Sequence, residues 1–322
     1  MKKTRQFVRL IQNELIKTFF QKKAIVFICI LILTVIASGI YGLKNDQGNL
    51  WKSKTEQQIS NLKQTISEEE VKSNLSDVDK EMLKSDQDNL HLMEYRLNHN
   101  MPDNVETPLR FAYESNGLVF LIVLFMAVFS ANLIANEYTG GTIRQILIKP
   151  IKRWKLFLAK YASAIIVCLL LCIILYSVAV IIGFLFFGHN SMSINDVVLL
   201  NGNLVERNML SFVVLSTLSD VFSIIVTCSI TFLMATIVRS GALAIVTTLG
   251  VYFAGLIGGS FISSSQIYRY ILTTNLTLSK YLPGEQLPFK GATFAFSLTV
   301  CLAYMVTFLI IGTLIFEKRD VY

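Results

Sequence analysis

The cysteines and histidines, the side chains best suited to covalent or metal chemistry, show no catalytic or ligand-binding spacing in this sequence. All five cysteines lie inside apolar stretches, where they behave as small hydrophobic residues: Cys29, Cys168, Cys172, Cys228 and Cys301. The three histidines lie in polar segments: His91, His99 and His189. Phosphate-loop, serine-hydrolase and H-E-x-x-H motifs are absent from the sequence. We therefore expect no enzyme activity, no metal site and no cofactor in this chain.

Asp220 is the only charged residue well inside a predicted membrane span. An ionisable group at membrane depth is a candidate for a pathway or gating role. The length of a membrane span favours another position for Asp220. If the span ends at Arg239 on the cytoplasmic side, about 20 residues at about 1.5 Å per residue cross the membrane, so the outer interface lies near Ser219. Asp220 is thus either a rim residue with a structural role or a pathway residue.

The remaining candidate for a functional segment is a cytoplasmic stretch, residues 135–161. Its sequence is ANEYTGGTIRQILIKPIKRWKLFLAKY. Gly140 and Gly141 permit a sharp change of direction, and Pro150 would end a short helix over 142–148. A short helix held between two spans could transmit a push from a partner to both. The alternative is an interfacial loop that carries ordinary cytoplasmic charge.

The composition identifies an integral membrane protein, with 53% hydrophobic residues and a mean hydropathy of +0.55. Apolar runs of twenty residues or more can cross a hydrocarbon core about 30 Å thick. We predict an all-α fold with six transmembrane helices: 24–43, 115–135, 161–187, 209–238, 240–262 and 293–316. The fourth run is too long for a simple span and must tilt or extend beyond the bilayer.

Lysine and arginine set the orientation. The segments 1–23, 136–160 and 317–322, with Arg239, hold 16 basic and 4 acidic residues, whereas the opposite side holds 13 basic and 17 acidic residues. Both termini are therefore expected in the cytoplasm, and the protein in the plasma membrane. The net charge of +7 reflects membrane topology and does not favour a nucleic-acid partner. The Lys-, Ile- and Asn-rich usage fits a Gram-positive bacterial source.

Two polar regions are predicted to be helical. Residues 1–23 contain an amphipathic helix for the inner membrane surface, although a plain continuation of the first span is the alternative. Residues 44–114 form an extracellular helical domain, in which apolar stripes pack on each other, on a second subunit or on the spans; mutual packing is favoured. The stripes are Ile59, Leu62 and Ile66; Leu75, Val78 and Met82; and Leu90, Met93 and Leu97.

The remaining polar segments are an extracellular loop at 188–208 and short re-entrant or interfacial helices at 263–292. Small residues recur every four positions in the fifth span: Gly250, Ala254 and Gly258, and also Gly255 and Gly259. Such stripes permit close helix approach. We expect packing within the chain first and a subunit interface second.

The pattern E-Y-x-x-G-T-I-R, followed by L-x-x-P-I-x-R, resembles the second cytoplasmic segment of ABC-2-type transporter permeases. The first part is matched by Glu137, Tyr138, Gly141, Thr142, Ile143 and Arg144. The second part is matched by Leu147, Pro150, Ile151 and Arg153. The order of parts also agrees, from the N-terminal interfacial helix to the six spans.

The resemblance implies a coupling helix that docks on a separate ATP-binding subunit. The coupling residues would be Asn136, Glu137, Tyr138, Gly141, Thr142, Ile143, Arg144, Ile146 and Leu147. It implies two ATP-binding subunits, which hold ATP and Mg, and a second permease copy or homologue. The large segment after span one is similar to that of the bacitracin-export, lantibiotic-immunity and sodium-export-like branches, and export of an amphipathic or peptide-like compound is the expected function.

Two other functions are open at this stage. The extracellular domain could bind a peptide in a membrane sensor or scaffold. A proton-coupled secondary carrier could use Asp220, although the sequence lacks the inverted repeat that such carriers usually show.

Overall fold

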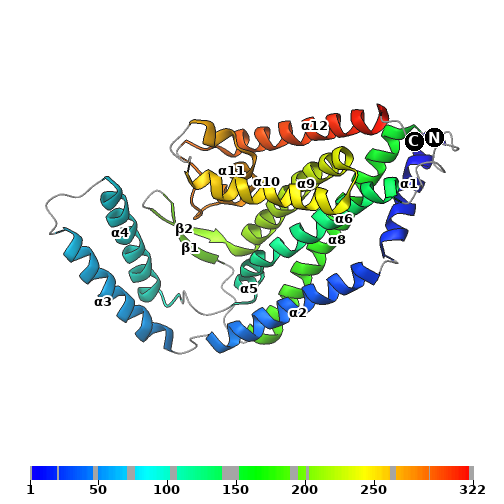
Figure 1. Cartoon of the computed structure of the whole chain (residues 1–322). Helices are drawn as coiled ribbons and strands as arrows, with labels where there is room; N and C mark the ends of the chain where they lie inside the picture. The colour runs from blue at the N-terminus through cyan, green and yellow to red at the C-terminus, as the bar shows by residue number, and fades with distance from the viewer. Residues whose placement is uncertain are drawn as a thin grey trace. The chain divides into compact units, whose positions relative to one another are not determined.

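A computed structural model describes residues 2–19, 22–45, 50–70, 77–101, 107–139, 152–188, 195–200, 203–261, 266–289 and 291–318 (Figure 1). Helices account for most of this part of the chain. The longer helices are α1 (Lys2–Phe19), α2 (Lys22–Asn45), α3 (Trp51–Glu70), α4 (Asp77–Asn98), α6 (Val119–Thr139), α8 (Arg153–Phe187), α9 (Met209–Val238), α10 (Gly241–Phe261) and α12 (Phe294–Lys318). The shorter ones are α5 (Pro108–Glu114), η2 (Ser115–Leu118), η3 (Gln266–Tyr270), α11 (Leu272–Leu276) and η4 (Leu278–Tyr281). The strands are β1 (Asn195–Leu200) and β2 (Asn203–Asn208).

Within the described residues, five helical segments are long and apolar enough to cross a membrane: Lys22–Lys44, Pro108–Glu137, Arg153–Phe187, Met209–Val238 and Phe294–Lys318. The protein is therefore an α-helical membrane protein, as the composition predicts. The fifth predicted span, 240–262, coincides with α10, whose apolar part counted on the same basis is the shorter Gly241–Gly255. Its crossing of the bilayer stays a prediction.

The helix boundaries differ from the predicted ones mainly at α8. This helix starts at Arg153, eight residues before the predicted span, and so includes Lys160. In contrast, α9 has the predicted bounds, because Arg239 adopts a left-handed conformation (φ 59°) that ends the helix before α10 begins.

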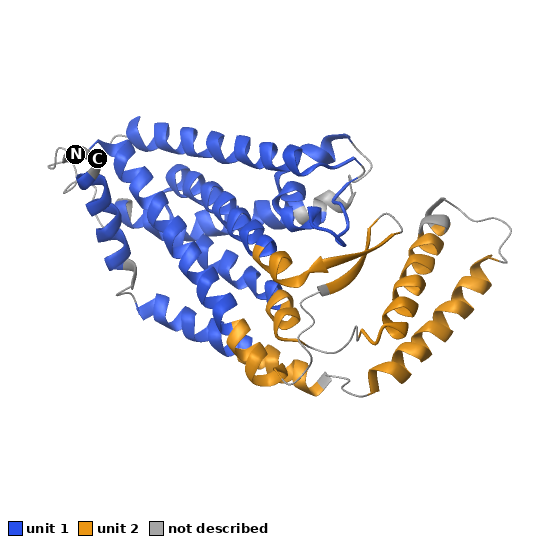
Figure 2. Ribbon diagram, turned by 180° about the vertical axis from the view of Figure 1, so that it is seen from behind, with its two compact units in different colours: residues 1–35, 115–178, 215–322 blue, residues 36–114, 179–214 orange. Residues whose placement is uncertain are grey.

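The chain forms two compact units, which Figure 2 shows in different colours. Unit 1 comprises Met1–Val35, Ser115–Val178 and Leu215–Tyr322, and unit 2 comprises Ile36–Glu114 and Ala179–Val214. Three long helices, α2, α8 and α9, contribute residues to both.

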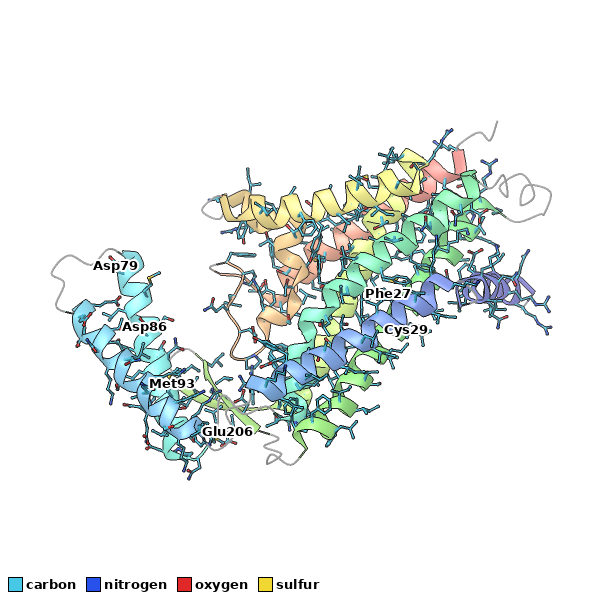
Figure 3. All side chains as sticks on the ribbon, turned by 60° about the horizontal axis from the view of Figure 1, so that its bottom comes forward. Phe27, Cys29, Asp79, Asp86, Met93 and Glu206 are labelled. Atoms are coloured by element: carbon cyan, nitrogen blue, oxygen red, sulfur yellow. The ribbon has the colours of Figure 1, made fainter. Side chains whose placement is uncertain are left out.

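Unit 2 contains the predicted helical segment. α3 and α4 pack on one another, with Ile59 and Ile66 of α3 buried and Lys63 Nζ 2.7 Å from Glu94 Oε1. The side chain of Met93 on α4 is half-buried (Figure 3). The helices that carry the first and third stripes therefore pack on one another. Met82 is exposed, so the second stripe does not follow the prediction at that position.

Unit 2 also contains an antiparallel hairpin of β1 and β2, where the sequence was interpreted as a loop. Val197 and Val198 of β1 are buried, and Val198 pairs with Val205. Asp196 joins the hairpin to α4, because its carboxylate accepts hydrogen bonds at 3.0 Å from both Arg96 and Arg207. The ion pair between the buried Arg96 and Asp196 stabilises this junction.

Unit 1 has an aromatic core where α8, α9 and α12 meet. The fully buried ring of Phe157 lies 5.6 Å from the rings of both Phe232 and Phe316. Gly312 of α12 faces Phe157 closely, since a Cβ there would lie 3.0 Å from the ring. α2 is attached through Phe27, whose ring stacks on Phe125 of α6 at 4.1 Å; Phe27 is labelled in Figure 3.

The segment after α10 consists of short helices, as predicted, although its place relative to the membrane stays a prediction. Asn275 of α11 closes this segment. Its amide nitrogen donates to the carbonyl oxygens of Arg269 and Ile271, and its side-chain oxygen accepts a hydrogen bond from Ser297 of α12. These bonds hold α11 against α12.

Candidate functional site

Two groups of buried polar side chains in unit 1 contain the functional candidates. The first is an ion cluster formed by Glu14 of α1, Glu137 of α6 and Lys160 of α8. The Lys160 Nζ lies 2.9 Å from Glu14 Oε2 and 2.7 Å from Glu137 Oε1. All three residues are buried, and Lys160 is only 1% exposed. This Lys160 ion cluster joins the N-terminal amphipathic helix to two helices of the membrane domain.

Because the three side chains are buried, each charge in this cluster depends on its partners for stabilisation. Ions removed from water lose solvation free energy, which only close opposite charges and hydrogen bonds offset. Lys160 is hydrogen-bonded to Glu14, and Lys17 lies 3.6 Å from the other Glu14 oxygen at the exposed side. The charges therefore compensate one another, and removal of Lys160 would leave two buried carboxylates without the cation between them.

The cluster changes the part that Glu137 can take in coupling. Its carboxylate pairs with Lys160 inside the protein and is not exposed at the surface. Asn136, the residue before it, is exposed. Tyr138 belongs to α6, but the surroundings of its side chain are outside the description. The other predicted coupling residues lie outside the described residues: Gly141, Thr142, Ile143, Arg144, Ile146 and Leu147.

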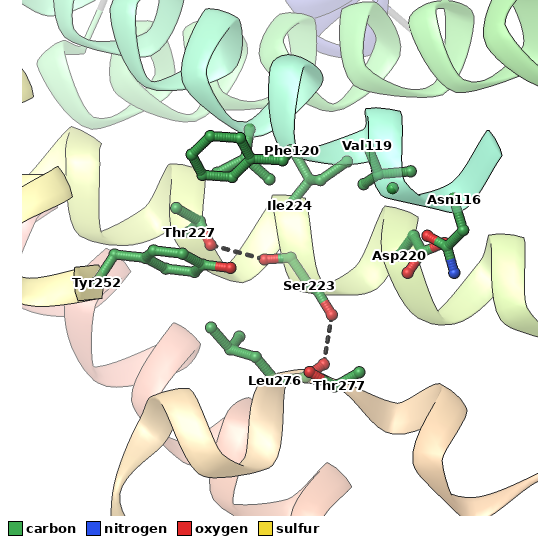
Figure 4. Close-up of a pocket in the computed structure, with 12 residues that line it drawn as sticks. Asn116, Val119, Phe120, Asp220, Ser223, Ile224, Thr227, Tyr252, Leu276 and Thr277 are labelled. Atoms are coloured by element: carbon green, nitrogen blue, oxygen red, sulfur yellow. Dashed lines mark hydrogen bonds between the residues drawn. The ribbon is translucent and has the colours of Figure 1, made fainter. Parts of the chain in front are cut away.

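The second group surrounds Asp220 in a pocket of about 160 Å³ (Figure 4). Asp220 is 8% exposed, and the Tyr176 hydroxyl of α8 donates a hydrogen bond to its Oδ2 at 2.9 Å. The walls come from η2, α6, α9, α10, α11 and the residue after α11. The lining residues are Asn116, Gly117, Val119, Phe120, Val123, Asp220, Ser223, Ile224, Thr227, Tyr252, Leu276 and Thr277.

The pocket offers more acceptors than donors on its α9 side. The Ser223 hydroxyl lies within hydrogen-bonding distance of the carbonyl oxygens of Ser219 and Leu276, and Thr227 donates to the Ser223 carbonyl oxygen at 2.9 Å. These protons are directed to the backbone, so the hydroxyl oxygens retain free lone pairs. In Figure 4 Asp220 and Asn116 lie toward one end of the pocket and Tyr252 toward the other.

Of the two positions considered for Asp220, the structure shows a buried residue that lines a pocket. Its depth in the bilayer stays a prediction. In the part of the chain that the structure describes, no three His, Cys, Asp or Glu side chains gather as metal ligands.

The small-residue stripe of α10 is divided between two environments. A Cβ on Gly255 would collide with the side chain of Thr273, so Gly255 permits close approach of α10 to α11. Gly250 has nothing within 4 Å of such a Cβ, and Ala254 is exposed. Gly258 and Gly259 lie in α10, but their surroundings are outside the described detail. Packing within the chain thus accounts for Gly255.

Sequence reasoning missed Glu14, Lys160 and Tyr176. Glu14 had a signal, because it follows Leu10 and Ile11 by four and three residues and so lies on the apolar face of its helix. Lys160 was counted among cytoplasmic charges, although it borders an uninterrupted apolar run. Nothing in the sequence pairs Tyr176 with Asp220.

Comparisons with known proteins give a family and two relatives. A family model described as "Protein of unknown function (DUF2705)" matches residues 84–322. The chain is 30% identical over 323 residues to "Uncharacterized protein YhcI" of Bacillus subtilis (strain 168), which covers 98% of this chain and 99% of that relative. It is 28% identical over 213 residues to "Uncharacterized membrane protein YdbK" of the same organism, which covers 64% of this chain and 80% of that relative.

Proposed function

This chain belongs to the DUF2705 family, and we propose that it is the permease subunit of an ATP-driven exporter for an amphipathic or peptide-like compound. Six spans, cytoplasmic termini and a plasma-membrane location are part of this proposal. A separate subunit, present in two copies, would bind ATP and Mg, and a second permease copy or homologue would complete the complex.

The Lys160 ion cluster is the observation that carries the proposal. Glu137 and Lys160 lie on either side of the segment that resembles a coupling helix, and Glu14 attaches the amphipathic α1 to Lys160, which also binds Glu137. Displacement of the segment by a partner would therefore reach α1, α6 and α8 as one body. α6 also forms part of the pocket wall, through Val119, Phe120 and Val123. The same helix thus links the coupling end to a polar site.

The resemblance supplies the nature of the partner. Tyr138, the exposed Asn136 and the predicted coupling residues between 141 and 147 would contact the ATP-binding subunit, whereas Glu137 would hold the end of α6 in position. Closure of that subunit on ATP would move α6 and α8, and the pocket would change its access from one side of the membrane to the other.

Co-purification tests the partner directly. The tagged chain is purified from the membranes of its own source cells, and the ATPase retained with it is measured. Arg144→Glu should lower retention about tenfold, because it reverses charge at the proposed contact. The matched control Lys318→Glu reverses an exposed charge at the other predicted cytoplasmic end and should retain the ATPase. Equal retention by both variants would argue against the coupling segment.

A proton-coupled carrier is the second candidate, and the buried pair of Asp220 and Tyr176 favours it. It requires transport in proteoliposomes that follows an imposed pH gradient without ATP. Transport that needs the ATP-binding subunit would exclude the carrier.

A further inference from the structure

We propose that the Asp220 pocket binds a compact organic ammonium group. If the chain is a permease, as proposed above, this group would be the recognised part of its cargo. Binding itself does not depend on that function. Carboxylate charge, acceptor geometry, aromatic lining and size lead to the same ligand class.

The charge of Asp220 disfavours an anion in the pocket and favours a cation. Asp220 is buried on a membrane helix and receives one hydrogen bond, from Tyr176. The described residues that line the pocket include no Lys, Arg or His. An ionised carboxylate in this setting is stabilised by a cation that enters the pocket, because buried charges require compensation.

The hydroxyl groups of Ser223 and Thr227 add acceptors to the pocket. Ser223 and Thr227 direct their protons to backbone carbonyl oxygens, which leaves lone pairs toward the pocket. An ammonium N–H group can donate to these oxygens and to Asp220 together. A carboxylate or phosphate would instead be repelled by Asp220 and would meet the acceptor oxygens of Ser223 and Thr227.

The apolar lining separates an organic cation from a metal ion. Phe120 and Tyr252 contribute aromatic rings, and ring faces attract ammonium groups. Hard metal ions instead require about six oxygen ligands, whereas much of this wall is Val119, Val123 and Leu276. The volume of about 160 Å³ is close to that of a cavity that holds benzene, about 150 Å³. A ring-sized body with one ammonium group fits these properties.

The test compares two probes of equal size, cyclohexylamine and cyclohexanol, by thermal unfolding of the purified full chain in a non-ionic detergent. The measurement is made at pH 7.0, where the amine is a cation because the pKa of an alkylamine is about 10. Cyclohexylammonium should raise the midpoint of thermal unfolding, and this effect should saturate with concentration. Its affinity should exceed that of cyclohexanol about tenfold, as expected for one added ionic contact. Equal affinities for the two probes in the wild-type chain would overturn the proposal.

Variants locate the site. Asp220→Asn should remove the tenfold preference, whereas Glu317→Gln, which removes the same charge at the exposed end of α12, should keep it. Tyr252→Leu keeps the carboxylate and should weaken only the amine, about threefold, through loss of the ring. If Asp220→Asn fails to fold, Tyr252→Leu decides, and an unchanged amine affinity there would overturn the site.

Three further arms define the ligand. If sodium or potassium chloride raises the unfolding midpoint to the same extent, and Asp220→Asn removes this effect, the pocket is a metal-ion site and the proposal is overturned. Displacement by single-chain alkylamines indicates a free amphiphile as the source, and displacement by short-chain phosphatidylethanolamine indicates a lipid head group; either supports the ammonium site. Amine binding without ATPase retention would support the ammonium site and reject the permease function. ATPase retention without amine binding would support the permease function and reject the ammonium site.

Discussion

The Lys160 ion cluster and the Asp220 pocket both bury carboxylates in unit 1, but they differ in what balances the charge. Glu14 and Glu137 have a lysine between them at 2.9 and 2.7 Å, whereas Asp220 has a tyrosine hydroxyl at 2.9 Å and an open pocket beside it. The cluster satisfies its charges within the chain. The pocket leaves acceptor capacity and space for another molecule.

This difference separates positioning from binding. A compensated cluster fixes the elements that carry it, because any relative movement would separate buried opposite charges. A carboxylate without a basic partner adds little rigidity and gains its compensation from a ligand. Variants that disturb each region should therefore differ in their effects on stability and on ligand affinity.

The largest effect is expected for Lys160→Met. It leaves Glu14 and Glu137 buried together, and loss of one partner of a buried pair costs about 3–5 kcal/mol. Chemical unfolding in detergent micelles, followed by tryptophan fluorescence, measures the change. Lys160→Met combined with Glu14→Gln and Glu137→Gln should recover most of the loss, because no unpaired charge is left. A change below about 0.5 kcal/mol for the single variant would mean that the cluster is not an ionic junction.

An intermediate effect is expected where α10 approaches α11 at Gly255; both helices also contribute residues to the pocket wall. Gly255→Leu introduces a side chain against Thr273 and should cost about 1–3 kcal/mol, as overpacking does. Gly250→Leu is the matched control on the same helix, with open space around it, and should stay within about 0.5 kcal/mol. The same unfolding measurement applies. Equal losses of unfolding free energy in the two variants would mean that α10 and α11 do not approach closely at Gly255.

Asp220→Asn should have the smallest effect on stability, below about 1 kcal/mol, because the amide oxygen still accepts the Tyr176 hydrogen bond while the isolated charge is removed. Unfolding of this variant without ligand, beside Lys160→Met, compares the two regions directly. A loss as large as that of Lys160→Met would make Asp220 a structural residue and remove the contrast.

Much of the helical architecture could be predicted from the sequence, because long apolar runs and the periodicity of Ile59, Leu62 and Ile66 are local properties of the chain. The hairpin at 195–208 was missed although Asn201 and Gly202 stand between two apolar runs, a common hairpin signal.

The candidate sites were only partly predictable. Asp220 was identified because a charge in an apolar run is conspicuous, but its partner Tyr176 is 44 residues away in sequence. Likewise, Glu14 and Lys160 are 146 residues apart and become neighbours only through packing of α1 on the membrane helices. Charges assigned to solvent by sequence position can thus be buried by tertiary structure.

ATP hydrolysis by the assembled complex tests the central claim most directly. The chain and its co-purified ATP-binding subunit are reconstituted in liposomes, and the rate is measured with cyclohexylammonium or cyclohexanol. The permease account predicts that the amine, and not the alcohol, changes the rate, and that Asp220→Asn removes this response while the ATPase stays bound. A hydrolysis rate that is the same with both probes, or no ATPase retained by the wild-type chain, would contradict it.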